Sequence, residues 1–188
     1  MHSYLVLLRG INVGGRNKIA MAALKALLDR SGFDGVATYL QSGNVVLRSA
    51  LGAEATARTI EAKLIAAFKL DSELIKVLVL SKAQAKAVID KRPKGFGDAP
   101  ETYHSDAIFV MGIGVAEAMT AFSPKEGVDT IWPGKGVIYS QRLSALRTKT
   151  RLNRMMASPL YLSMTIRSWG TMLKLVEMLA NSETGAGT

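Results

Sequence analysis

The architecture of this chain can be inferred outward from one segment, Ser3-Tyr4-Leu5-Val6-Leu7-Leu8-Arg9-Gly10-Ile11-Asn12-Val13-Gly14-Gly15-Arg16-Asn17-Lys18. Residues 3–8 are apolar and rich in β-forming side chains, which predicts a strand. The loop from Leu8 to Lys18 contains three glycines, two asparagines, two arginines and a lysine, and no carboxylate. Residues 20–30 then place apolar side chains on one helical stripe. We therefore expect a strand, a glycine-rich basic loop and a helix.

The elements that follow complete a recognisable order. The same criteria predict strands at 36–40, 45–48 and 75–80, with helices at 53–68 and from 81 to about 90. The turn Gln41-Ser42-Gly43-Asn44 joins the first two of these strands as a hairpin. The resulting order, β-α-β-β-α-β, is the split βαβ of a ferredoxin-like fold.

A second set of elements repeats this order. Strands are expected at 107–111, 130–132 and 137–140 and within 160–166, and helices at 115–122, 146–157 and 168–180. We predict an α+β protein made of two tandem ferredoxin-like (βαββαβ) halves with antiparallel sheets. The first half spans residues 1–92 and contains the glycine-rich loop, and the second spans 93–181. Residues 182–188 are predicted to form a disordered tail.

The predicted topology locates a site. The two strands joined by a βαβ unit are parallel, so the ends of the first two strands lie at the same edge of the sheet. The glycine-rich loop and the hairpin turn should therefore be neighbours. The candidate ligand-binding residues at this edge are Arg9, Asn12, Gly14, Gly15, Arg16, Lys18, Gln41, Ser42 and Asn44.

The glycine-rich loop has two interpretations. Two glycines separated by four residues precede Arg16, which nearly matches a phosphate-binding loop, but the lysine and the hydroxyl of that motif are replaced. The remaining features, flexible backbone amides before a helix N-terminus and three cations, are typical of an anion site. Alternatively, the glycines only satisfy positive φ in a long turn. The hairpin turn is likewise either purely structural or a donor of hydrogen bonds to a ligand.

The charge distribution suggests a second binding surface. The chain of 188 residues has a net charge of +9, and residues 130–176 hold eight Lys and Arg with no acid. This basic 135–174 region favours an anionic partner, so weak, sequence-independent nucleic-acid binding is an alternative function. It can also be an ordinary solvated face. An enzyme acting on a phosphorylated substrate is a third possibility, although the two histidines lie in neither loop and no acid–base group is apparent near the candidate site.

Two residues near the last helix also attract interest. Arg167 could grip a phosphate, and Trp169 could stack a ring, or Trp169 could anchor the helix in the core.

The remaining composition restricts the chemistry. The chain has no cysteine, and no His/Asp/Glu cluster has metal-ligand spacing. No apolar run reaches membrane-spanning length, and the first residues lack the features of a signal peptide, so a cytoplasmic protein is expected. These patterns predict no metal and no membrane partner, and leave any cofactor and the oligomeric state undetermined.

Three motifs resemble the signatures of the bacterial DUF1697 family of conserved proteins of unknown function: Leu8-Arg9-Gly10-Ile11-Asn12-Val13-Gly14-Gly15, Gln41-Ser42-Gly43-Asn44-Val45-Val46, and Met164-Thr165-Ile166-Arg167-Ser168-Trp169-x-Thr171-x-x-Lys174-Leu175. The resemblance covers nearly the whole chain. It implies an α+β fold and supplies no activity, cofactor or catalytic residue. Gly170 stands where the family pattern usually has asparagine, which puts any side-chain role at that position in doubt.

Overall fold

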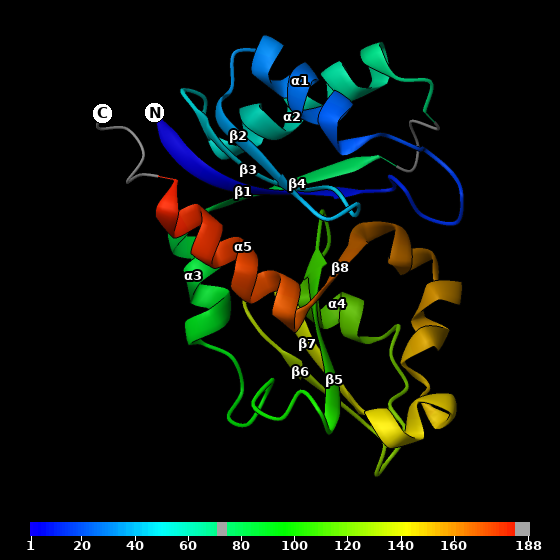
Figure 1. Cartoon of the computed structure of the whole chain (residues 1–188). Coiled ribbons are helices and arrows are strands. Elements are labelled where there is room, and N and C mark those ends of the chain that lie inside the picture. Colours follow the sequence, from blue (N-terminus) through cyan, green and yellow to red (C-terminus); the bar gives the residue numbers. More distant parts are fainter. Residues whose placement is uncertain (71–74, 183–188) are drawn as a thin grey trace. The chain divides into compact units, whose positions relative to one another are not determined.

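The computed structural model describes residues 1–70 and 75–182, and its chain divides into two compact units (Figure 1). The first unit comprises Met1–Lys86 and the chain from Lys174, and the second comprises Ala87–Leu173. The division falls within two helices, α3 (Lys82–Asp90) and α5 (Trp169–Asn181). The boundary predicted between residues 92 and 93 stays a prediction. Of the tail predicted to be disordered, all but Ser182 lies outside the described residues.

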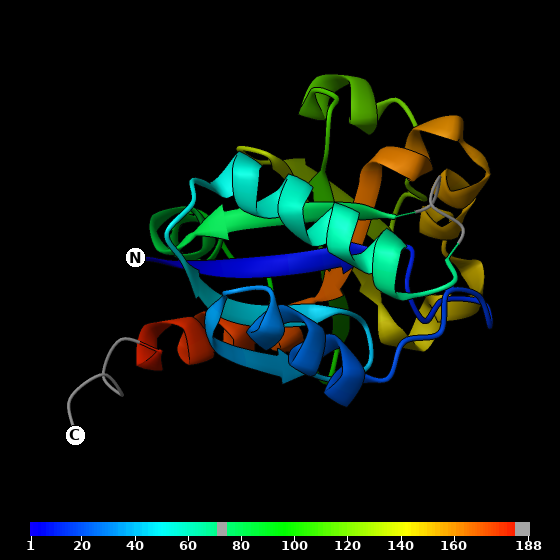
Figure 2. The ribbon, with the colours of Figure 1, turned by 90° about the horizontal axis from the view of Figure 1, so that it is seen from above.

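The first unit is an antiparallel sheet of four strands in the order β2-β3-β1-β4, with two helices on one face. Seen from above, α2 runs along β4 and α1 lies beside β2 (Figure 2). The bounds are β1 His2–Arg9, α1 Met21–Arg30, β2 Asp34–Tyr39, β3 Asn44–Ser49, α2 Ala53–Ala67 and β4 Lys76–Ser81. Alternate β1 residues Tyr4, Val6 and Leu8 pack in the same core cluster as Leu24 of α1 and Ile60 of α2. The side chains that alternate along the strand and those that recur every 3.6 residues along the helices thus share one core.

The second unit repeats the strand order as β6-β7-β5-β8, again entirely antiparallel. Its strands and short helix are β5 Tyr103–Val110, α4 Val115–Met119, β6 Asp129–Pro133, β7 Val137–Leu143 and β8 Met164–Ser168. One face of the sheet buries Ile108 and Ile138 against Ala118 of α4 and Met155. Two antiparallel sheets with the same strand order confirm the predicted α+β class and the tandem ferredoxin-like arrangement.

One predicted element is wrong. The α-helix expected at 146–157 is a series of 3-10 segments, η2 (Ser144–Lys149) and η3 (Leu152–Ala157), followed by η4 (Pro159–Ser163). Thr150 between them is extended, and its hydroxyl bonds outside the helical pattern, to the Asp129 carboxylate. Hydroxyl side chains that find such partners compete with helix formation. Arg147 and Arg151 would also repel each other at a spacing of four residues in an α-helix.

Candidate functional site

The glycine-rich loop folds as a small hairpin. The Arg16 N–H donates to the Val13 carbonyl at 3.0 Å, and the two residues form a β-bridge. Between them Gly14 and Gly15 have φ of +58° and +76°, the signature of a type I′ turn. Residues 13–16 are all exposed. Positive φ therefore accounts for both glycines, and the turn carries Arg16 into solvent.

The Asn12 side chain ties this hairpin to the turn after β2. Its Nδ2 donates to the carbonyls of Ile19, at 2.9 Å, and of Gln41, at 2.8 Å. Its Oδ1 accepts from the Ile19 N–H at 2.8 Å. Asn12 also has a φ of +52°, which asparagine tolerates better than most residues. The predicted proximity of the loop and the turn is thus present in the structure. The Asn12 Nδ2 donates its hydrogen bonds to backbone carbonyls.

The turn itself leaves no room at its glycine. The Leu8 N–H donates to the Gly43 carbonyl at 2.8 Å. A Cβ added at Gly43 would lie 2.7 Å from the Leu8 Cβ and 2.8 Å from the Ile11 Cδ1. Asn44 is fully buried, and its Nδ2 donates to the Tyr39 carbonyl and to the Ser42 Oγ, both at 2.9 Å. Gly43 and Asn44 therefore shape the turn from within.

Other candidate side chains at this edge face solvent. Arg16, Lys18, Gln41 and Ser42 are exposed, whereas Arg9 is half-buried at the end of β1. Residues 1–28 of the sequence contain no acid, so the local charge is positive. The accessible groups of this edge are cations, an amide and a hydroxyl.

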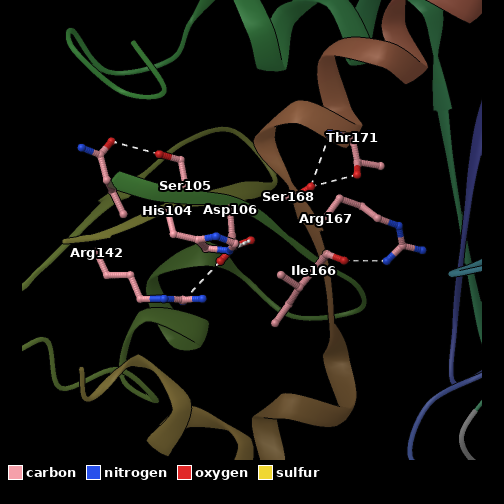
Figure 3. A network of polar contacts seen from close by, with 9 residues as sticks. His104, Ser105, Asp106, Arg142, Ile166, Arg167, Ser168 and Thr171 are labelled. Carbon is pink, nitrogen blue, oxygen red and sulfur yellow. Dashed lines mark hydrogen bonds and ion pairs between the residues drawn. The ribbon is translucent and has the colours of Figure 1, made fainter. Parts of the chain in front are cut away.

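Arg167 belongs to the second unit and is buried, with 6% of its surface exposed. Its Nη1 donates to the Thr165 Oγ1 at 2.9 Å. The same Nη1 donates to the Ile166 carbonyl at 2.7 Å (Figure 3). Burial lowers the pKa of its guanidinium to about 10. Trp169 is likewise buried, with its ring 5.0 Å from that of Phe96 in an edge-on contact. Trp169 is a core anchor rather than an exposed stacking surface.

Sequence reasoning missed a charged cluster on the second sheet. The His104 Nε2 lies 3.1 Å from the Asp106 Oδ1, and the Arg142 Nη1 donates to the Asp106 Oδ2 at 3.4 Å (Figure 3). Burial, the largest influence, raises the pKa of the Asp106 carboxyl, and the charges of His104 and Arg142 act against it. A carboxylate beside histidine can orient the imidazole for proton transfer. The i, i+2 spacing of His104 and Asp106 signals a shared strand face, but Arg142 requires the β5–β7 register.

Asp129 of β6 is a second buried carboxylate, and it pairs in register with Arg142 of β7. Its Oδ1 accepts from the Thr150 hydroxyl at 2.6 Å, and its Oδ2 accepts from the backbone N–H groups of Arg151 and Lys125, both at 2.9 Å. Burial raises the pKa of the Asp129 carboxyl, but these hydrogen bonds and the Arg142 charge together lower it below its ordinary value. Asp129 thus holds the beginning of η3 against β6.

The described residues offer neither a metal site nor a membrane-spanning helix. Within residues 1–70 and 75–182, no three His, Asp or Glu side chains gather as a metal site would require. In the same ranges, the helices are too short or too polar to cross a membrane.

Comparison with known proteins gives a family and a structural relative. A conserved bacterial protein, SP0830 from Streptococcus pneumoniae, has a similar structure with a TM-score of 0.81 and 26% sequence identity, over 95% of this chain and 98% of that one. A search of curated proteins finds no match. The family model described as "Protein of unknown function (DUF1697)" matches residues 1–139. Because this match spans well over half of the 188 residues, the chain belongs to the DUF1697 family.

Proposed function

We propose that the chain binds a phosphorylated or otherwise anionic small molecule through the Arg9–Lys18 loop and the Gln41–Asn44 turn. The observation that supports this most directly is the Asn12 carboxamide, whose Nδ2 bonds both the Ile19 and the Gln41 carbonyls. Lys18 immediately precedes Ile19, so Asn12 connects the backbone beside this cation to the backbone of the turn at Gln41. The site is held by the fold before any ligand arrives, which lowers the ordering cost of binding.

The chemistry of the exposed groups favours an anion. Guanidinium and ammonium groups donate hydrogen bonds and accept none, and a phosphate or carboxylate oxygen accepts them. Arg16 and Lys18 provide such donors, and Gln41 and Ser42 add uncharged ones. Arg167, a further candidate from the sequence, belongs to the other unit and is omitted from this site.

A thermal-shift screen with anionic metabolites, followed by calorimetric titration of any hit, tests the proposal. The double variant Arg16→Ala/Lys18→Ala should weaken binding about a hundredfold or more, because charge-assisted hydrogen bonds contribute about 1.5–3 kcal/mol each and two are lost. The matched control is Lys63→Ala/Lys69→Ala, which removes two exposed cations elsewhere in the first unit. A hit that stabilises wild type, double variant and control equally would contradict the anion site.

Sequence-independent nucleic-acid binding by the basic 135–174 region is a second candidate function. One observation favours it: Arg147, Lys149, Arg151 and Arg154 are all exposed along η2 and η3. Because each phosphate contact releases counterions, affinity for an oligonucleotide should fall steeply with salt. A salt-insensitive affinity, or no binding at low salt, would exclude this function while leaving the small-molecule site intact.

A further inference from the structure

The basic residues of η2 and η3 stand on an unusually well-anchored backbone. Leu152 and Met155 are buried beneath the segment, with 3% and 5% of their surface exposed. Thr150 connects the two 3-10 segments, and its hydroxyl donates to Asp129 while accepting from the Leu152 N–H at 3.1 Å. The Arg151 N–H donates to the same Asp129 carboxylate. The cations therefore project from an ordered surface rather than from a loose loop.

The cations of this segment suit the backbone of a nucleic-acid strand. The segment provides four cations, three of them arginines, whose planar guanidinium groups match phosphate oxygens.

The exposed neighbours also favour nucleic acid over a membrane. Thr148 and Asn153 are exposed and polar, and such side chains commonly bind backbone phosphates. Among the residues of η2 and η3, all of which are described, Met156 is the one large apolar side chain that is exposed. A single methionine gives a segment little apolar area to insert between lipids.

We infer that Asp129 is a positioning residue that preorganises Arg147, Lys149, Arg151 and Arg154 to bind the phosphodiester backbone of a nucleic acid. This inference rests on the second candidate function above. The negative charge of Asp129 repels a nucleic acid, whereas its hydrogen bonds hold the basic segment in place. If only the charge matters, removing Asp129 strengthens nucleic-acid binding. If the hydrogen bonds matter more, removing it weakens binding, so the inference is testable.

The test measures anisotropy of a labelled, mixed-sequence single-stranded oligonucleotide with the full chain over a range of salt. Four phosphate contacts predict a slope of log affinity against log salt of about −3 for wild type. Asp129→Asn should weaken binding about three- to tenfold, equivalent to about 0.7–1.4 kcal/mol, although the variant is more positive by one charge. If Asp129→Asn does not fold, Thr150→Val decides, because it removes the side-chain hydrogen bond to Asp129 without changing any charge.

Controls separate anchoring from charge. Thr150→Ser keeps the hydroxyl and should restore wild-type affinity. Arg151→Ala should flatten the salt slope by about 0.7, the share of one single-strand contact. Lys94→Ala removes an exposed cation of the second unit that lies outside the basic 135–174 region, and should leave affinity unchanged.

Each outcome has a defined meaning. Weaker binding by Thr150→Val and rescue by Thr150→Ser support the inference. Equal or tighter binding by folded Asp129→Asn or Thr150→Val overturns the role of Asp129 and leaves nucleic-acid binding standing. A wild-type protein that ignores the oligonucleotide, including one that binds only vesicles of phosphatidylcholine and phosphatidylserine, overturns both.

Discussion

Replacing Asn12 by alanine is the sharpest test of the loop geometry. The variant loses three hydrogen bonds, two donated by Nδ2 and one accepted by Oδ1, at 2.8–2.9 Å. Each is worth about 1 kcal/mol, less for the solvent-exposed bond to Gln41. The φ of +52° adds about 1 kcal/mol, because alanine does not favour the left-handed region. We expect the free energy of unfolding to fall by about 2–4 kcal/mol.

Urea denaturation followed by circular dichroism measures this loss, and a melting temperature lower by about 4–16 °C should accompany it. Asn12→Gly is the matched control, since it removes the same bonds but tolerates positive φ, and should be about 1 kcal/mol less destabilising. Hydrogen exchange at the Ile19 amide, which donates to Asn12, reports the local effect. A loss below about 0.5 kcal/mol with unchanged protection of Ile19 would refute the reasoning.

Three further substitutions test other features. Gly43→Ala should cost about 3 kcal/mol or more, seen as a lower urea midpoint, because its Cβ would lie 2.7 Å from Leu8 at a φ of +72°. Gly15→Ala should cost about 1 kcal/mol in the same assay, because a Cβ at Gly15 would meet no atom within 4 Å and only the φ of +76° disfavours it. Similar losses in the two variants would disprove the packing argument. Asp106→Asn tests how the protonation of Asp106 affects stability. Burial raises the pKa of Asp106 above its ordinary 3.8, so the free energy of unfolding of the wild type falls as the pH rises from that value through the folded pKa. The variant should therefore gain stability relative to wild type between acidic and neutral pH in urea titrations, and a relative loss on raising the pH would contradict the shift.

Local patterns were sufficient for the sheets. The apolar run of β1 and the glycine turn before β3 follow from alternation and turn chemistry, which depend on neighbours in sequence. The order of these elements then placed the loop beside the turn, as the Asn12–Gln41 bond bears out. The same reasoning failed at residues 146–157, because Thr150 has its partner 21 residues away in β6. Propensity cannot anticipate a bond of that kind.

The candidate site was predicted less completely than the fold. Sequence indicated which residues carry donors, but not where those donors point. Asn12 illustrates this, because its direction depends on a carbonyl 29 residues away. Arg142 shows the converse problem: nothing near it in sequence indicates Asp106, which lies 36 residues away across a strand pair. That the loop binds an anion stays a prediction until a ligand is found.

The bond between Asn12 and Gln41 also has a consequence for the order of assembly. It closes a stretch of chain that contains α1 and β2, so the hairpin reaches its final shape only after these elements have packed. Long-range contacts of this kind form late because their closure entropy must be offset first. The hairpin is then expected to be among the first parts to open on denaturation. A molecule that binds only the closed form would, by mass action, stabilise the whole first sheet. Binding of a ligand at this surface loop could then be measured as a higher stability of the core of the first sheet.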